Sequence, residues 1–169
     1  DVMRPNQSLD GLTARLIERL GRVLAEERPD AVVVQGDTTS TFCGALAGFY
    51  HGVPIGHVEA GLRTGDLRSP FPEEMNRVLT TRLARWHFAP TSHNRDNLLE
   101  EGVPDDAIYV TGNPVIDALR FVAGRVREGI MGAEARALVE RFGGRPFILI
   151  TGHRRESFGE PFRELCAAI

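Results

Sequence analysis

Hydrophobic and polar residues alternate along this chain in two rhythms, one typical of helices and one of buried strands. Between residues 8 and 28, apolar residues recur every three or four positions, which predicts an amphipathic helix that ends before Pro29. Further helices are predicted over 38–52, 72–84, 91–101, 114–126 and 133–142, with a last one starting at Ser157. Short apolar runs predict strands at 31–36, 53–59, 86–89, 107–111 and 146–151.

Strands that alternate with helices predict an α/β fold built from parallel βαβ units. Three of the predicted strands, in VVVQGD, YVTGN and LITGH, end in a glycine followed by a polar residue. Ligands of open α/β sheets bind beyond the carboxyl ends of the strands. Glu59 lies at the same edge, at the end of the strand predicted over 53–59. We therefore expect Asp37, Glu59 and His153 to converge there.

Composition narrows the classes of function. The chain has 169 residues and a net charge of −3, with acidic and basic residues mixed throughout, so no nucleic-acid partner is expected. No apolar run approaches the ~20 residues of a membrane span, so no membrane partner is expected either. Cys43 and Cys166 fall on apolar helical faces and are predicted to be small core residues, consistent with a reducing cytoplasm. Because Asp1 is not methionine and the last predicted helix has no cap, we expect a piece of a longer protein.

Acidic residues stand at several predicted element boundaries. Glu59 follows an apolar strand, and a carboxylate in such a position normally has a partner or a task. Asp37 in GDTTS opens a helix and suits either a simple N-cap or proton transfer. Glu73 and Glu74 lie in a first helical turn, where acids are common, so this pair alone favours dipole stabilisation over catalysis.

The segment HRRESFG, residues 153–159, lies between a predicted strand and a predicted helix. His153 and Arg154 there suit an anion such as a diphosphate. His51, His57 and His93 match no zinc spacing, and the chain has neither a GxGxxG nor a GxxxxGK[ST] motif, so no metal and no cofactor are expected. The residues indicate a proton-transfer site with room for a phosphorylated substrate, without naming the reaction.

Six segments together resemble one enzyme family. They are VQGDTTST, GVPIGHVEAGLRTGD, SPFPEEMNR, HFAPT, VTGNPVIDAL and ITGHRRESFG, and they follow one another along almost the whole chain. In this order they resemble the non-hydrolysing UDP-N-acetylglucosamine 2-epimerases. The combination of HVEAGLRTGD, PEExNR and TGHRRES is very specific to that family.

The resemblance implies two Rossmann-like domains of the GT-B type, both incomplete here. Residues 1–112 would be the later part of the first domain and 113–169 the start of the UDP-binding second domain. Such enzymes are cytoplasmic homodimers that interconvert UDP-GlcNAc and UDP-ManNAc, precursors for cell-surface polysaccharide, by eliminating and re-adding UDP. Gln35 stands where many relatives carry histidine, which we expect to be tolerated because Asp37 is kept.

Matching the motifs residue by residue implies which side chains act. The catalytic set would be Asp37, Glu59, Glu73 and His153, with Asp37 and Glu73 as the pair that transfers protons. Asp37, Glu59, His153 and Arg154 would contact the substrate. The alternatives are a hydrolysing epimerase that releases UDP and ManNAc, glycosyl transfer on the same fold, and a non-catalytic nucleotide-sugar-binding module. The isolated 169 residues are expected to be inactive.

Overall fold

The computed structural model describes residues 2, 7–151 and 159–169, which divide into two compact units, Asp1–Asn113 and Pro114–Ile169. The first unit holds a sheet of four parallel strands in the order β1-β2-β3-β4. Its strands are β1 (Val32–Gln35), β2 (Ile55–Val58), β3 (Trp86–Ala89) and β4 (Ile108–Val110). The parallel α/β class predicted from the sequence is confirmed, as are the first four strand positions.

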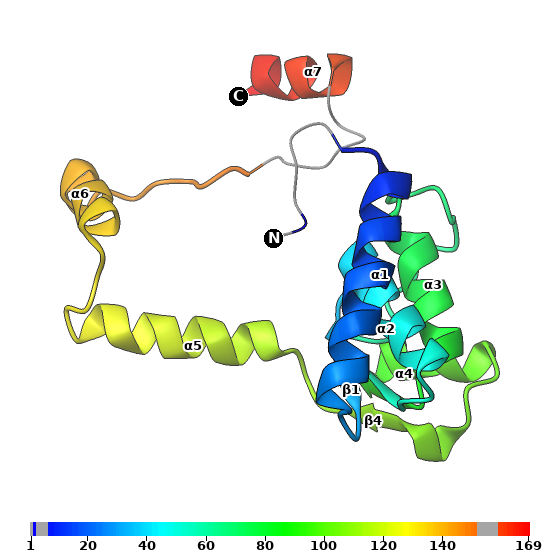
Figure 1. Ribbon diagram of the computed structural model, residues 1–169. Coiled ribbons are helices and arrows are strands. Elements are labelled where there is room, and N and C mark those ends of the chain that lie inside the picture. Colours follow the sequence, from blue (N-terminus) through cyan, green and yellow to red (C-terminus); the bar gives the residue numbers. More distant parts are fainter. Residues whose placement is uncertain (1, 3–6, 152–158) are drawn as a thin grey trace. The chain divides into compact units, whose positions relative to one another are not determined.

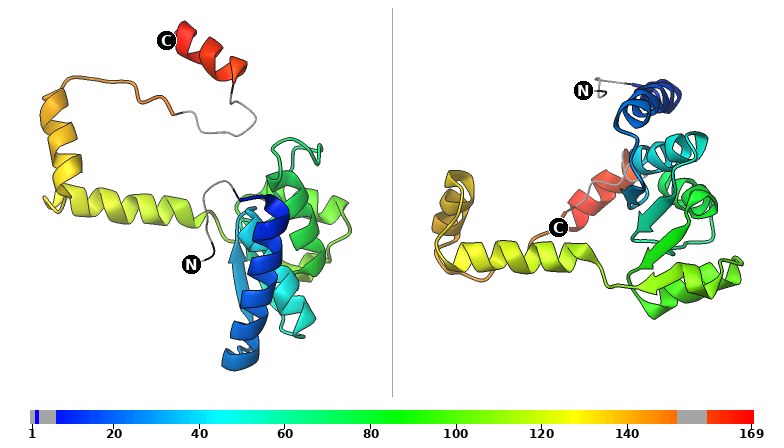
Figure 2. Two further views of the ribbon diagram at one scale, coloured as in Figure 1. Left: turned by 45° about the horizontal axis from the view of Figure 1, so that its top comes forward. Right: turned by 60° about the horizontal axis from the view of Figure 1, so that its bottom comes forward.

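Helices alternate with these strands in the first unit (Figure 1). They are α1 (Leu9–Glu27), α2 (Thr39–Tyr50), α3 (Glu73–Leu83) and α4 (Ser92–Glu100), and a short 3-10 helix, η1 (Asp105–Ala107), precedes β4. Helix α1 packs along α2, and both α2 and α3 contact the β1–β2 half of the sheet. Helix α4 contacts β3 and β4. Figure 2 gives two further views of this helical cover.

The core of the first unit lies between one face of the sheet and these helices. One cluster joins Val34, Ala45 and Ile55 under α2, and another joins Ala89 and Leu98 with neighbours under α4. Strand side chains alternate between the two faces of a sheet, so the intervening residues point the other way. In the edge strand β1 this leaves Val33 67% exposed, whereas the inner strand β2 has three buried residues in a row.

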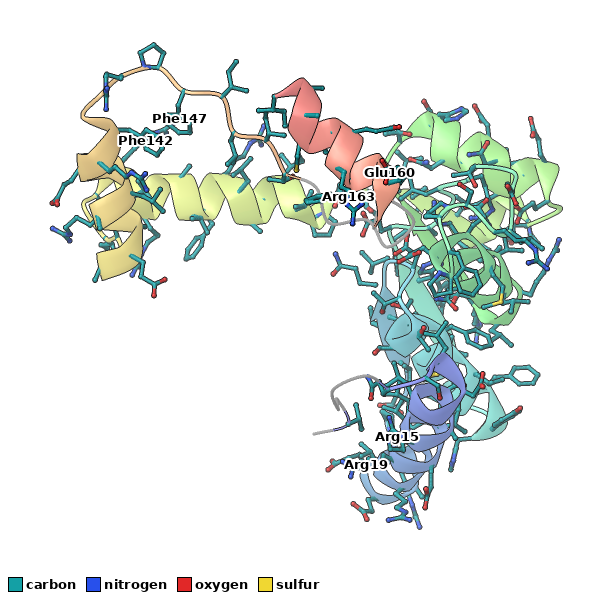
Figure 3. The ribbon with its side chains drawn as sticks, turned by 90° about the horizontal axis from the view of Figure 1, so that it is seen from above. Arg15, Arg19, Phe142, Phe147, Glu160 and Arg163 are labelled. Atoms are coloured by element: carbon teal, nitrogen blue, oxygen red, sulfur yellow. The ribbon has the colours of Figure 1, made fainter. Side chains whose placement is uncertain are left out.

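The second unit contains α5 (Pro114–Arg127), α6 (Ala133–Phe142) and α7 (Glu160–Ala168). None of these helices has a buried residue. The rings of Phe142 and Phe147 stack with centroids 4.7 Å apart, and Arg163 pairs with Glu160 on α7 (Figure 3).

Two predictions that fall in this unit are wrong. Residues 146–151 were predicted as a strand, yet 145–151 form none and Ile148 is 88% exposed. A strand needs a neighbour to satisfy its backbone N–H and C=O groups, and no described residue of this unit forms another strand. Cys166 is exposed rather than part of a core, because the apolar face of α7 is not covered by described residues, whereas Cys43 is fully buried as predicted.

Candidate active site

Asp37 lies in the turn that follows β1, at the carboxyl edge of the sheet. Gly36 has a φ of +78°, a backbone conformation that glycine adopts without strain. The N-cap of α2 is Thr38, whose side chain accepts a hydrogen bond from Thr41 N, so the interpretation of Asp37 as a simple N-cap is wrong. The Asp37 carboxylate instead accepts a bond from Arg77 on α3, with Nη2 to Oδ2 at 2.8 Å. The Asp37 side chain is 30% exposed and can meet a ligand.

Side chains from three elements fix the backbone of this turn. Thr41 Oγ1 donates to the carbonyl of Gln35 at 2.6 Å, and Asn76 Nδ2 donates to that of Asp37 at 2.8 Å. His57 Nε2 lies 2.8 Å from the carbonyl oxygen of Gly36 and is therefore the donor. Three successive carbonyl groups are thus held from α2, β2 and α3.

Glu59 directly follows β2 and lies beside the Asp37 turn. The β1–β2 register pairs Gln35 with Val58, so Gly36 and Glu59 leave the sheet side by side. A Cβ placed on Gly36 would be 3.7 Å from Glu59 Oε2. The other carboxylate oxygen of Glu59, Oε1, accepts a bond from Asn113 Nδ2 at 3.3 Å, so the predicted strand ends QGD and TGN do meet through Glu59.

The backbone of Glu59 is strained. Its φ of +69° is a left-handed conformation that a non-glycine residue rarely adopts, at a cost of about 1–3 kcal/mol. Such strain persists only where the surroundings impose it, and it gathers at functional sites. Here the strained residue carries a partly exposed carboxylate that lies near Gly36, the residue before Asp37.

The neighbouring glutamates of α3 have different surroundings. The carboxylate of Glu74 is 1% exposed, and its Oε1 accepts bonds from the backbone N–H groups of Thr64 and Gly65 at 2.9 and 3.1 Å. Its Oε2 lies 3.4 Å from Arg77 Nη1. Glu74 therefore ties a loop to the start of α3. Glu73 is partly exposed and precedes Arg77 by four residues, so these two residues share a face of α3.

Two buried histidines lie side by side beneath the site. His57 and His87 are register partners on β2 and β3, with exposed fractions of 0% and 2%. Burial lowers the pKa of His57, against the opposing effect of its bond to Gly36. Burial, followed by the proximity of His57, lowers the pKa of His87 to about 4. Both rings are therefore neutral at physiological pH.

The other residues predicted from the sequence are not seen to join the group around Asp37 and Glu59. His51 and His93 are exposed, and the described residues contain no group of three or more His, Cys, Asp or Glu arranged to hold a metal ion. His153 and Arg154, the predicted anion site, lie outside the described residues. No helix in the described part of the chain is long and apolar enough to cross a membrane.

Sequence reasoning did not identify the residues that hold Asp37. Asn76 and Arg77 belong to the PEEMNR motif, but only its glutamates were considered as functional residues. The available signal was their spacing, because positions 76 and 77 follow Glu73 by one helical turn and so share its face. The site as described has two partly exposed carboxylates: Asp37, held by the buried Arg77, and Glu59, which accepts a bond from the partly exposed Asn113. Such groups can exchange protons with a bound ligand.

Comparison with known proteins identifies the family. A family model described as UDP-N-acetylglucosamine 2-epimerase matches residues 1–169. The UDP-N-acetylglucosamine 2-epimerase of Yersinia pestis is 54% identical over 174 residues, which cover 100% of this chain and 46% of that protein. The Escherichia coli K12 protein of the same name is 51% identical over 176 residues, again covering 100% of the chain and 46% of the relative.

Solved structures of UDP-GlcNAc 2-epimerases resemble the chain as well. The Neisseria meningitidis UDP-GlcNAc 2-epimerase bound to UDP-GlcNAc superposes with a TM-score of 0.83 at 44% identity, over 98% of this chain and 47% of that one. The Methanocaldococcus jannaschii enzyme in complex with UDP-GlcNAc and UDP gives 0.71 at 36% identity, over 80% and 36%. The chain thus spans about half the length of the relatives it matches. The predicted GT-B-type α/β fold, present here in part, is confirmed, and the chain belongs to the UDP-N-acetylglucosamine 2-epimerase family.

Proposed function

We propose that the protein containing this chain interconverts UDP-GlcNAc and UDP-ManNAc without hydrolysing them, and that this chain supplies the acid–base groups. The observation that carries the proposal is the position of Asp37 and Glu59 just beyond the carboxyl ends of two adjacent parallel strands, where Glu59 lies against Gly36. Relatives crystallised with UDP-GlcNAc, and with UDP-GlcNAc and UDP, support a nucleotide sugar as the ligand. We expect the isolated chain to be inactive, since it spans about half of such proteins.

The proposed reaction needs proton transfer on both faces of the sugar. A base removes the C2 proton while the C1–O bond to UDP breaks, which leaves a 2-acetamidoglucal and free UDP. The UDP oxygen then adds back to C1 as an acid delivers a proton to the opposite face of C2. Atoms and electrons balance without an oxidant or reductant, so the reaction requires no redox cofactor.

Asp37 and Glu73 are the proposed proton-transferring pair. Arg77 occupies Oδ2 of Asp37, so Oδ1 is the atom we propose for proton transfer. Glu73 is the first residue of α3, one turn before Arg77, whose guanidinium bonds to Asp37. Glu59 is proposed to contact the sugar from a third direction.

The departing diphosphate needs cationic partners. His153 and Arg154 are proposed to bind it, because an imidazole and a guanidinium beside a helix start suit phosphate oxygens. Residues 1–112 would then belong to the domain that holds the sugar, and 113–169 to the start of the UDP-binding domain. We also propose that the full-length protein is a cytoplasmic homodimer that supplies precursors for cell-surface polysaccharide.

Amide substitutions test the acids in the full-length protein. Asp37→Asn and Glu73→Gln keep shape but remove the titrating proton, so kcat should fall by roughly 10²–10⁴-fold. KM should change little in comparison. Asp105→Asn is the control, since Asp105 is exposed, pairs with Arg95 and stands away from the carboxyl edge of the sheet. Wild-type turnover in both acid variants would overturn the proposed roles.

Isotope exchange and product identity test the mechanism. In heavy water, product formed by the wild-type protein should carry deuterium at C2, because the proton removed there exchanges with solvent. Product that keeps its original C2 hydrogen would exclude elimination and re-addition. Release of UDP with free ManNAc would identify a hydrolysing enzyme, whereas UDP-ManNAc is the expected product.

A further inference from the structure

Helix α3 links the two proposed acid–base residues. Glu73 is its first residue, and Asn76 and Arg77 follow one turn later on the same face. Both of these side chains bond to Asp37, which stands 39 and 40 positions earlier in the sequence. Asn76 donates to its backbone carbonyl and Arg77 to its carboxylate, each at 2.8 Å. One helix therefore carries one acid and holds the other.

The two donors are buried and leave Asp37 little freedom. Asn76 is 1% exposed and Arg77 is 9% exposed, whereas the carboxylate they orient reaches solvent. Thr41 and His57 fix the two preceding carbonyl groups of the same turn. Because neighbouring peptide units are already held, the contacts from α3 decide where the end of this turn lies.

The start of α3 is itself anchored. The buried carboxylate of Glu74 accepts two backbone N–H groups from the loop after β2, and Arg77 Nη1 lies 3.4 Å from its other oxygen. Arg77 thus bridges two carboxylates, the buried one of Glu74 and the partly exposed one of Asp37. A guanidinium can do this because its N–H groups form a planar fork, which the single ammonium of lysine does not reproduce.

We propose that Asn76 and Arg77 are positioning residues, which hold Asp37 at a set distance from Glu73 through the rigid body of α3. This inference rests on the proposed function, in which Asp37 and Glu73 exchange protons with the sugar. Acid–base catalysis depends on the placement of both groups, and a misplacement of about 1 Å costs roughly 10²-fold in rate. The contacts matter for turnover more than for substrate affinity.

Two substitutions in the full-length protein avoid leaving a buried charge without a partner. Asn76→Ala removes the bond to the Asp37 backbone, and Arg77→Lys keeps a cation beside Glu74 while losing the fork. We expect kcat to fall by about 10–100-fold in each, with KM within about threefold of wild type. Adding Asn76→Ala to Asp37→Asn should lower kcat by less than about threefold beyond Asp37→Asn alone, because Asn76 acts by placing the Asp37 carboxylate.

Glu101→Gln is the matched control. Glu101 pairs with Arg63 in the same unit, at 2.5 Å and at a similar burial, and neither side chain bonds to Asp37 or to the side chains that hold it. It should lower stability much as the test variants do, but leave kcat unchanged. A loss of kcat in this control equal to that in Asn76→Ala would attribute the effect to general destabilisation and overturn the proposal.

Amide hydrogen exchange gives a readout that does not depend on activity. Asn76→Ala should raise deuterium uptake in a peptide covering the turn from Gly36 to Thr38, and Glu101→Gln should not. Unchanged deuterium uptake in that peptide would overturn the positioning role. So would wild-type kcat in Asn76→Ala and Arg77→Lys while Asp37→Asn is impaired, and either result would leave the proposed function standing. Wild-type kcat in Asp37→Asn and Glu73→Gln would instead refute the proposed function, whatever the exchange result.

Discussion

Replacing Gly61 by alanine should destabilise the first unit far more than replacing most other glycines. Gly61 follows Glu59 by two residues in the segment HVEAGL and has a φ of +86°. A Cβ at this position would lie 2.1 Å from the backbone carbonyl oxygen of Asn94 and 2.8 Å from its carbon. Backbone atoms cannot turn aside as a flexible side chain can, so either the loop or α4 must move.

The magnitude follows from two separate costs. The left-handed backbone conformation costs an alanine about 1–2 kcal/mol. Forcing an extra methyl group against a packed helix adds about 1–3 kcal/mol. The movement would also disturb bonds to the Gly61 carbonyl from Asn94 Nδ2 at 3.3 Å and Asn97 Nδ2 at 2.9 Å. We expect a total loss of roughly 2–5 kcal/mol in the free energy of unfolding.

Gly52→Ala is the control that isolates the backbone cost. Gly52 has a φ of +68°, and a Cβ there would meet nothing within 4 Å. Urea unfolding of the full-length variants, followed through Trp86 on β3, gives both free energies from the transition midpoints. If Gly61→Ala loses no more stability than Gly52→Ala, the steric argument is refuted.

Two further predictions concern stability. The pKa of His87 is about 4 when folded and ordinarily 6.5, so the unfolded state takes up a proton first as the pH falls. The free energy of unfolding should therefore drop by about 2–3 kcal/mol between pH 7 and 4.5 on account of this residue. In His87→Leu, the free energy measured by urea unfolding should vary less with pH over that range. The same pH dependence in the variant as in the wild type would contradict the lowered pKa of His87. Glu59→Gly should be about 1 kcal/mol more stable than Glu59→Ala by the same assay, because both lose the bond to Asn113 and only glycine relieves the positive φ. Equal stability would mean that the backbone there is not strained.

Periodicity in the sequence predicted most of the elements because it is local information. An apolar residue every three or four positions indicates which face of a helix will be buried, whatever it packs against. The helix predicted over 8–28 spans Leu9–Glu27, and the strand predicted over 86–89 spans Trp86–Ala89. The strand predicted over 146–151 is absent because pairing depends on a neighbour, which an apolar run cannot supply.

The candidate site was likewise predictable only in part. Glycine and an acid after an apolar run were enough to bring Asp37 and Glu59 to one edge of a parallel sheet, since parallel strands end together. Which donor holds each acid could not be predicted, because the contacts join residues far apart along the chain. His57 reaches Gly36 across 21 positions, Arg77 reaches Asp37 across 40, and Asn113 reaches Glu59 across 54.

The sequence alone therefore determined the order of elements in the first unit, the edge at which Asp37 and Glu59 lie, and the family. Only the tertiary structure decided that Glu74 is buried and Glu73 partly exposed, although the two are adjacent acids in one helical turn. A rotation of about 100° per residue along a helix points the two side chains in different directions, so that Glu74 bonds to the loop while Glu73 stays partly open to solvent. Which direction is buried depends on what the helix packs against, and that is a property of the folded chain.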